Sequence, residues 1–353
     1  MLMGRPSIAA LLFFAVALVY PWPARSAEVI VGLVQLRTED AGNFMVMKEL
    51  AKEARDQGAT LVIFPEASDL GWLNPAAFTQ AEPIPGRYSD AFADIASELG
   101  LWVAAGLTEK GPKAGPGSRP DAFLAYDSGI LINPKGQVVL HHRQFNVVKN
   151  AFDSVACQTI FNEPQCSYTP GEKEDIDIVQ TPLGRTALLV CADAYTYAPA
   201  AALERLKTLS PDFVIVPWGI TASVQNQCGT KDFNATRYAA EAATFLKSAF
   251  VVGANAVGER TYGRFLPSVY CGDSGYATPT GVPVEAALPR SALVLVRIPG
   301  TFDAPAGPLK NETDATRICP GVCNSYSSAW NRDWEAANGG DAGSCGCMVD
   351  AGP

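Results

Sequence analysis

Short apolar runs alternate with amphipathic segments along most of the chain. Residues 28–36 and 61–64 are rich in Val, Ile and Leu, and each run has the length of a strand rather than of a buried helix. Between them, apolar side chains recur at helical spacing from Phe44 to Ala54, and Gly58 follows as a stop signal. A chain in which strands and helices alternate in this way is predicted to form an α/β fold.

The alternation continues toward the C-terminus. Further strands are expected at 101–107, 122–132, 137–148, 176–180, 186–190, 213–217, 250–254, 276–284 and 292–298, and further helices at 89–99, 199–209 and 232–247. Turn residues at 133–136 join two of these strands into a hairpin, whereas 110–120 is a loop rich in Gly and Pro. Residues 149–175 show no period, and we interpret them as a long insertion, a candidate for a disulfide-stapled lid.

Composition adds the domain organisation. The chain has 353 residues, of which 48% are hydrophobic and 18% charged, so it can bury a substantial core. After Gly300 the composition shifts to Gly, Asp, Asn, Ser and Cys. We therefore predict one domain at 28–300 and a cysteine-rich tail at 301–353 without a core of its own. The net charge of -9 and the lack of a Lys/Arg-rich run argue against a nucleic-acid partner.

The segment 1–27 has the layout of a secretory signal peptide. Arg5 precedes an apolar run at 8–20, and small residues at 24–27 follow it, with cleavage expected after Ser26 or Ala27. The run is short for a bilayer span, although an uncleaved membrane anchor is the alternative. No later segment is long and apolar enough to span, so we expect a secreted or periplasmic mature protein without a membrane span.

Export makes the cysteine count informative, because thiols in an oxidising compartment are normally paired. The nine cysteines are Cys157, Cys166, Cys191, Cys228, Cys271, Cys319, Cys323, Cys345 and Cys347. An odd number leaves at least one thiol free or paired with another chain, and setting Cys191 aside leaves eight cysteines for four disulfides. The last four cysteines also admit a four-thiolate zinc site as an alternative.

Two reactive residue types stand at predicted strand ends. The apolar run 186–190 leads into Cys191, where the chain turns, and the run 61–64 leads to Glu66 behind Pro65. A carboxylate next to a thiol can take its proton, and a strand end is a rigid mount for both groups. Each residue alone is also compatible with a structural role, Cys191 as a small core residue and Glu66 as a solvated loop residue.

Four segments at or near these residues occur in a characteristic order, namely FPEAS at 64–68, VCAD at 190–193, VIVPWG at 214–219 and VVGANAVG at 251–258. Together they resemble the successive signatures of the nitrilase, or carbon–nitrogen hydrolase, superfamily over residues 28–298. The segments TPLGRTALLVCADAYTYAP at 181–199 and CGDSGYATPTG at 271–281 are most similar to the secreted branch that contains vanins (pantetheinases) and biotinidase.

The resemblance implies a four-layer αββα sandwich and a Glu-Lys-Cys triad that hydrolyses amides or nitriles through a thioester or thioimidate. Glu66 falls on the base and Cys191 on the nucleophile. The backbone N–H of Ala192 falls on an oxyanion-hole donor. Asp193 would be a structural partner of the Cys191 corner or simply a turn residue.

The triad Lys is where this chain departs from the family. The Lys ends the second arm of the hairpin, and the run 141–148 places Gln144 at that position if Asn146 aligns with the family Asn. An amide offers only a neutral N–H where a Lys supplies a full positive charge to the oxyanion and the thiolate. Arg143 should point to the opposite face of the strand. Lys149 does so too unless a bulge folds it back, which makes it the possible substitute cation.

We therefore expect an exported hydrolase that acts on a linear small-molecule amide, with Glu66 as base, Cys191 as nucleophile and Gln144 orienting the substrate. No cofactor is required, and no metal is expected because His141 and His142 have no further ligands at suitable spacing. Two alternatives stay open. One is a pseudoenzyme that keeps the fold as a binding module, and the other is an acyltransferase that uses the same Cys. Either a monomer or a homodimer is compatible with the sequence.

Overall fold

A computed structural model describes residues 28–181, 183–197, 200–285, 291–326, 328–336 and 343–348. The predicted signal peptide at 1–27 and its cleavage site lie outside these residues. Within the described ranges, no helix is both long and apolar enough to cross a membrane.

The first of two large sheets has six strands in the order β15-β1-β2-β3-β4-β5. Its strands are β1 (Val29–Val34), β2 (Leu61–Ile63), β3 (Trp102–Lys113), β4 (Phe123–Ile132), β5 (Val138–Arg143) and β15 (Leu293–Ile298). Strands β1, β2 and β3 are parallel, whereas β15, β4 and β5 pair antiparallel to their neighbours. The parallel centre follows from the strand–helix alternation, because parallel neighbours need a crossover connection.

The second sheet has the order β14-β13-β10-β8-β7-β6, with β7, β8 and β10 parallel. Its strands are β6 (Ile178–Thr181), β7 (Gly184–Leu188), β8 (Phe213–Ile215), β10 (Phe250–Gly253), β13 (Gly275–Ala277) and β14 (Pro283–Glu285). A small sheet, β11-β12-β9, lies beside it and consists of β9 (Thr221–Ala222), β11 (Val257–Glu259) and β12 (Val269–Cys271). Short 3-10 turns are η1 (Thr38–Asp40), η2 (Lys173–Asp175), η3 (Cys191–Ala194) and η4 (Gln225–Gln227).

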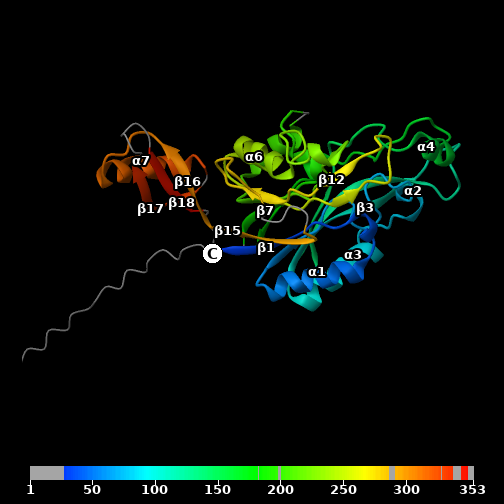
Figure 1. Cartoon of the computed structure of the whole chain (residues 1–353), viewed down its shortest axis with the longest axis horizontal. Helices are drawn as coiled ribbons and strands as arrows, with labels where there is room; N and C mark the ends of the chain where they lie inside the picture. Colours follow the sequence, from blue (N-terminus) through cyan, green and yellow to red (C-terminus); the bar gives the residue numbers. More distant parts are fainter. Residues whose placement is uncertain are drawn as a thin grey trace, which may run out of the picture.

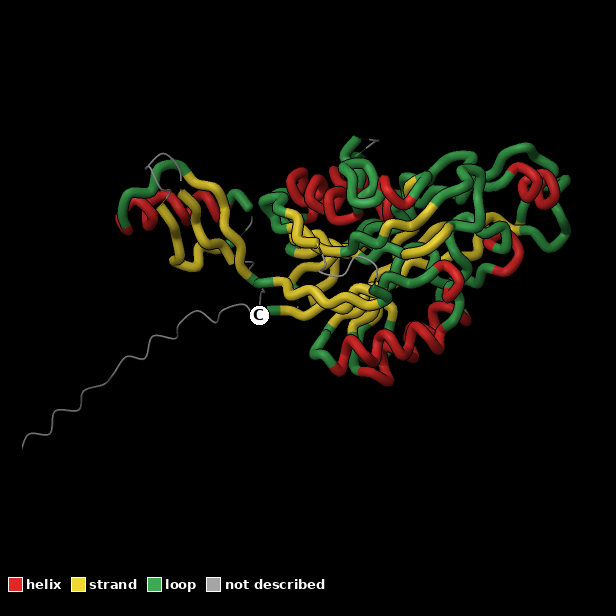
Figure 2. Tube along the Cα trace, in the orientation of Figure 1, coloured by secondary structure: helices red, strands yellow, loops and turns green. Residues whose placement is uncertain are grey.

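The two six-stranded sheets pack face to face, and helices cover both outer faces (Figures 1 and 2). Val31 and Leu33 of the first sheet share the inner core with Ile215 and Val252 of the second. Helices α1 (Phe44–Asp56) and α3 (Arg87–Leu99) pack on the first sheet. Helices α5 (Ala201–Leu209) and α6 (Ala235–Leu246) pack on the second. The predicted four-layer αββα sandwich is confirmed.

Several strands are shorter than predicted, and two of them differ most from the prediction. The run 276–284 is a hairpin of β13 and β14, in which Gly281 N–H donates to the Thr278 carbonyl. Pro and Gly inside the run are turn signals that outweigh its apolar residues. The second arm of the first hairpin ends at Arg143 rather than at 148, so Gln144 lies just beyond the regular strand.

The insertion at 149–175 is more ordered than its lack of period indicates. It contains helix α4 (Ser154–Phe161), whose first N–H groups donate to the Asp153 side chain. A Cys157–Cys166 disulfide staples it, as predicted. Phe152 and Tyr168 pack with Phe78 of α2 (Ala77–Gln80) in a separate apolar cluster. Its role as a lid stays a prediction.

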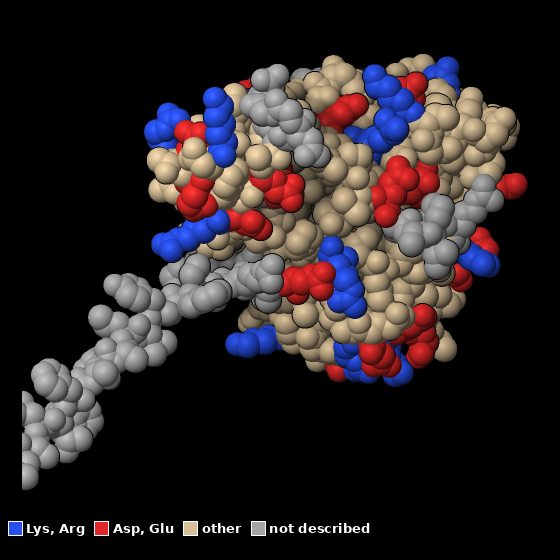
Figure 3. Space-filling view, turned by 60° about the vertical axis from the view of Figure 1, so that its left-hand side comes forward, with Lys and Arg blue, Asp and Glu red and all other residues tan. Residues whose placement is uncertain are grey.

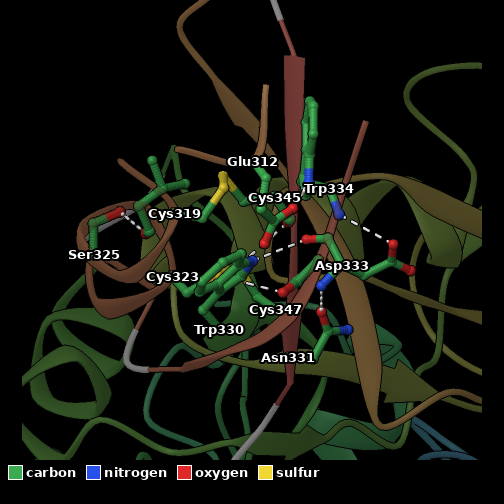
Figure 4. The surroundings of a disulfide bond; sticks show 12 residues. Glu312, Cys319, Cys323, Ser325, Trp330, Asn331, Asp333, Trp334, Cys345 and Cys347 are labelled. Atoms are coloured by element: carbon green, nitrogen blue, oxygen red, sulfur yellow. Dashed lines mark hydrogen bonds between the residues drawn. A yellow bond between two sulfur atoms is a disulfide. The ribbon is translucent and has the colours of Figure 1, made fainter. Parts of the chain in front are cut away.

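The tail folds into a small sheet and a helix, and its buried residues belong to the same apolar cluster as the two large sheets, so its lack of a core of its own stays a prediction. Strands β16 (Thr301–Ala306), β17 (Ala329–Ala336) and β18 (Gly343–Met348) form a sheet in the order β16-β18-β17, and helix α7 (Glu312–Asn324) packs on it. Disulfides Cys319–Cys345 and Cys323–Cys347 connect the helix to β18 (Figure 4). The four cysteines are fully buried in one cluster with Phe302 and Leu309, so the two disulfides pack as apolar groups together with large apolar side chains of the tail.

Eight of the nine cysteines are paired, the remaining disulfide being Cys228–Cys271, and Cys191 is free and buried. The prediction from the odd cysteine count is therefore confirmed. Because its four thiols are paired in disulfides, the tail does not form the alternative zinc site. Four disulfides also indicate an oxidising environment for the folded chain.

The surface carries charges of both signs. On the face in Figure 3, basic and acidic side chains lie singly or in small mixed groups. Exposed ion pairs such as Lys52–Asp56 and Arg297–Glu28 contribute little, because solvent screens them, so stability resides in the buried cores. The predicted absence of a nucleic-acid partner stays a prediction.

Candidate active site

The ends of β2 and β7 bring Glu66 and Cys191 together. The segment after β8 binds the two turns that contain Glu66 and Cys191. Glu66 N–H donates to the Trp218 carbonyl at 3.2 Å, and Cys191 N–H donates to the Pro217 carbonyl at 3.0 Å. The Cys191 thiol lies within hydrogen-bonding reach of the Glu66 carboxylate. The two residues that the sequence singled out are therefore in contact although they are 125 positions apart.

Both corners contain a residue in the left-handed region of backbone conformation. Cys191 has φ 41°, and Ala67, next to Glu66, has φ 47°. Such conformations cost roughly 1–3 kcal/mol for residues other than Gly and occur where surrounding contacts impose them. Here the sharp turns leave the thiol and the carboxylate beside each other at the strand ends.

Gln144 occupies the third position. Its backbone N–H donates to the Asp127 carbonyl at 2.7 Å, and its carbonyl accepts from Gly171 N–H at 2.8 Å. The buried side chain donates from Nε2 to Glu66 Oε1 and to the Val190 carbonyl, each at 3.3 Å. The structure thus brings the amide against the Glu66 carboxylate, and both its equivalence to the family Lys and its catalytic role stay predictions.

Neither nearby cation joins the site. Arg143 points to the other face of β5 and pairs with Glu109, which also contacts His141, as strand alternation predicts. Lys149 is exposed, whereas Glu66 and Gln144 are buried, so the expected substitute cation does not reach them. Within the described part of the chain, no Lys or Arg forms an ion pair with Glu66.

Asp193 fastens the Cys191 corner to the segment that carries Gln144. Its fully buried carboxylate lies 2.7 Å from His142 Nε2 and accepts from the backbone N–H groups of Phe145 and Asn146. Asp193 is thus a structural partner of the Cys191 turn, which is one of the two roles predicted for it. Among the described residues, no group of His, Cys, Asp and Glu is arranged to hold a metal ion.

Asp127 is a site residue that the sequence analysis missed. It lies on β4, is 1% exposed, and neither carboxyl oxygen has a donor among the described residues. Burial raises its pKa well above the usual value, and the charge of Glu66 raises it further. Since a buried carboxylate without donors is costly, burial and the charge of Glu66 favour the protonated form of Asp127, which is suited to donate to Glu66. The available signal was an acidic residue inside the apolar run 122–132.

The electrostatics keep the thiol protonated in the free protein. Burial raises the pKa of Cys191 well above its usual value, and the negative charge of Glu66 adds to this, while the backbone N–H of Gly219 opposes it. Burial also raises the pKa of Glu66, to about 7, against the lowering effect of hydrogen bonds from Asp127 and Cys191. At neutral pH a fraction of Glu66 is therefore ionised and able to accept the thiol proton.

Gly219 gives Glu66 its space. A Cβ at this position would lie 1.8 Å from Glu66 Oε2, so any larger residue would displace the carboxylate.

Ala192 follows the nucleophile in η3, and its neighbours Cys191 and Asp193 donate their N–H groups to the carbonyls of Pro217 and Val190. Within the described hydrogen bonds of this turn, the Ala192 N–H has no backbone acceptor, which suits the predicted oxyanion-hole donor.

A pocket opens beside Glu66. It encloses about 400 Å³, counting the solvent at its mouth, and Pro65, Trp72, Arg260, Tyr262 and Tyr270 are among its walls. On the other side, the hydroxyl of Tyr195 lies 3.9 Å from Cys191 Sγ. The sequence analysis assigned no role to these side chains.

Comparison with known proteins gives a match over most of the chain. The sequence profile described as carbon-nitrogen hydrolase matches residues 30–299. A deaminated glutathione amidase from Homo sapiens is 30% identical over 156 residues, 43% of this chain and 44% of that protein. A pantetheine hydrolase from Homo sapiens is 23% identical over 205 residues, 51% of this chain and 36% of that protein. The match thus spans less than half the length of either relative.

Solved structures give the same fold. An amidase from Nesterenkonia sp. has a TM-score of 0.57 at 18% identity, covering 81% of this chain and 94% of that chain. A mutant of the amidase from Nesterenkonia sp. AN1, with the acetamide moiety of fluoroacetamide added covalently at its active site cysteine, has a TM-score of 0.56 at 17% identity. It covers 78% of this chain and 92% of that chain. Identity this low shows the fold alone.

Proposed function

Because the chain belongs to the carbon-nitrogen hydrolase family, we propose that it hydrolyses a small linear amide through a thioester on Cys191. The observation that supports this proposal best is the contact of the Cys191 thiol with the Glu66 carboxylate, in a buried site where Gln144 donates to the same carboxylate. A nucleophile, a base and a neutral donor thus face one small volume.

The first half-reaction forms the thioester. Glu66 accepts the proton of the thiol as Cys191 Sγ attacks the amide carbon, and the carbonyl electrons move to oxygen. The Ala192 N–H and the Gln144 side chain are the proposed donors to this oxyanion. When the intermediate collapses, the C–N bond breaks and the proton on Glu66 passes to the departing amine.

The second half-reaction releases the acid. Glu66, again ionised, accepts a proton from a water molecule that attacks the thioester carbon, and the C–S bond breaks as the carbonyl reforms. The thiolate takes back the proton from Glu66, which restores the starting state. Asp127 keeps its proton throughout and stabilises the ionised form of Glu66 by donating to it.

One observation favours a second candidate, a binding module with impaired catalysis. Burial and the negative charge of Glu66 both disfavour ionisation of the Cys191 thiol. Among the described residues, no Lys or Arg pairs with Glu66 to offset this effect. Loss of one charged oxyanion donor costs roughly 3 kcal/mol, about a hundredfold in rate. A slow hydrolase and a binding module therefore differ in whether any acyl enzyme forms.

Mass spectrometry of the mature protein after incubation with small amides separates the two. A covalent acyl group on Cys191, absent from Cys191→Ala, or turnover that this variant loses, supports the hydrolase. Fluoroacetamide is a suitable trap, since its acetamide moiety adds to the active site cysteine of the mutant Nesterenkonia amidase. A Cys191 that neither acylates nor alkylates, in a folded protein that binds amides, refutes the hydrolase and leaves the binding module.

We also propose that the protein acts outside the cytoplasm, in a secreted or periplasmic form. The four disulfides support this, because they persist in oxidising compartments. Sequencing the N-terminus of exported protein tests it, with Ala27 or Glu28 expected as the first residue.

A further inference from the structure

Arg260 is a buried cation without a counter-ion. It follows β11, is 4% exposed, and donates from Nη2 to the Phe265 carbonyl at 2.7 Å. Its Nε and Nη1 atoms are buried and have no hydrogen-bond partner within the described residues. No carboxylate of the described chain forms an ion pair with it.

Such an arrangement is unfavourable for an isolated protein. A guanidinium keeps its charge, and burial without a paired anion leaves it poorly solvated. The face of the Trp72 ring, 5.3 Å from the guanidinium carbon, provides a cation–π contact but no negative charge. Arg143, by contrast, has a two-pronged pair with Glu109 although it is more exposed. The five donors of Arg260 are therefore suited to an anion that the folded chain does not supply.

The location indicates what that anion is. Arg260, Glu66 and Tyr270 line the same pocket, and the charges of Glu66 and Arg260 both shift the pKa of Tyr270. The Glu66 carboxylate, when ionised, supplies negative charge at one end of the pocket, and the Arg260 guanidinium supplies positive charge at the other. A molecule with a neutral amide and a separate carboxylate would be oriented by this polarity, with the amide at Cys191.

We propose that Arg260 binds a carboxylate of the substrate, so that the preferred substrates are amides that carry an anionic group. This inference rests on the proposed hydrolase and specifies its substrate class. The Trp72 face positions the guanidinium, and Nη1, which has no partner among the described residues, donates to a carboxylate oxygen.

Kinetics with matched substrates test the inference. The monoamide of succinic acid and its methyl ester have the same amide but differ in charge, and N-acetyl-β-alanine carries the carboxylate on the amine side. We expect the protein to favour one of the anionic amides in kcat/KM. Arg260→Gln should lower that preference at least about tenfold, because the anionic amide loses its counter-ion and the neutral ester has none to lose. Arg264→Gln is the matched control, because Arg264 is exposed in the same loop and its loss removes the same charge.

A binding measurement separates this inference from the proposed function. Calorimetry measures the binding affinity of the same compounds for Cys191→Ala, which cannot turn them over. It then measures the same affinities for the double variant that also carries Arg260→Gln. Anion-selective binding that Arg260→Gln abolishes, without turnover by the parent protein, supports Arg260 and refutes the hydrolase. Turnover of neutral and anionic amides alike, unchanged in Arg260→Lys and Arg260→Gln, supports the hydrolase and overturns the role of Arg260.

Discussion

Replacing Gln144 by Lys introduces a cation at the position that the resemblance assigns to the family's triad Lys. Gln144 Nε2 lies 3.3 Å from Glu66 Oε1, where opposite unit charges attract by about 5 kcal/mol at an effective dielectric constant of about 20. Burying the ammonium costs part of this, since Gln144 is only 3% exposed. A net effect of about 1–3 kcal/mol remains, which lowers the pKa of both Glu66 and Cys191 by about one to two units because carboxylate and thiolate are stabilised.

The assay is the rate at which iodoacetamide alkylates Cys191, followed by mass spectrometry across a wide pH range. Cys191 is the free thiol of the chain, so labelling reports on it alone. Gln144→Met is the control, because it keeps the side-chain length without charge or N–H. We expect the Lys variant to react at lower pH than the parent protein and to turn over amides about tenfold faster. If the Lys and Met variants titrate alike, the argument from the missing charge is refuted.

The buried carboxyl groups and the tail give three further expected outcomes. Glu66 must be ionised to act as base, so kcat/KM should rise with pH through about 7; a pH-independent rate would exclude this carboxylate. Asp127→Asn keeps a donor to Glu66, so the pH at which kcat/KM rises should stay the same, whereas Asp127→Leu should raise that pH by about one unit. If both variants lower that pH, Asp127 is charged in the parent protein. Replacing Cys323 and Cys347 by Ala opens a disulfide of sequence separation 24 and should cost about 3 kcal/mol of unfolding free energy in urea titrations. Amide turnover should persist in that variant, and its loss would place the tail in the working site.

The tail and the insertion are less clear in the sequence for a common reason. The large apolar residues of the tail are scattered among Gly, Asp, Asn and Ser, so its sequence indicates no core, yet two disulfides pack with some of them as buried apolar groups between α7 and β18. The insertion at 149–175 lacks a period because its helix is short, and the Asp153 cap was the available local signal. In both segments, cross-links and caps contribute what hydrophobic periodicity does elsewhere.

The sequence by itself determined the layers and the main chemistry. Alternating strand and helix patterns are local, so they indicated the α/β sandwich, and the odd cysteine count indicated one free thiol. Glu66 and Cys191 were identifiable because each follows a strand within a recognisable motif. Gln144 could be placed because it follows the hairpin directly.

Only the tertiary structure decided which groups meet and which charges are left unpaired. The contact of Asp127 with Glu66, the space provided by Gly219, and the lack of a partner for Arg260 depend on packing between segments far apart in the chain. The protonation of a carboxyl group or thiol depends on burial and on neighbouring charges, and neither is fixed by residue type or spacing. For that reason the sequence indicated a nucleophile and a base, whereas the fold revealed an acidic centre and the pocket cation opposite it.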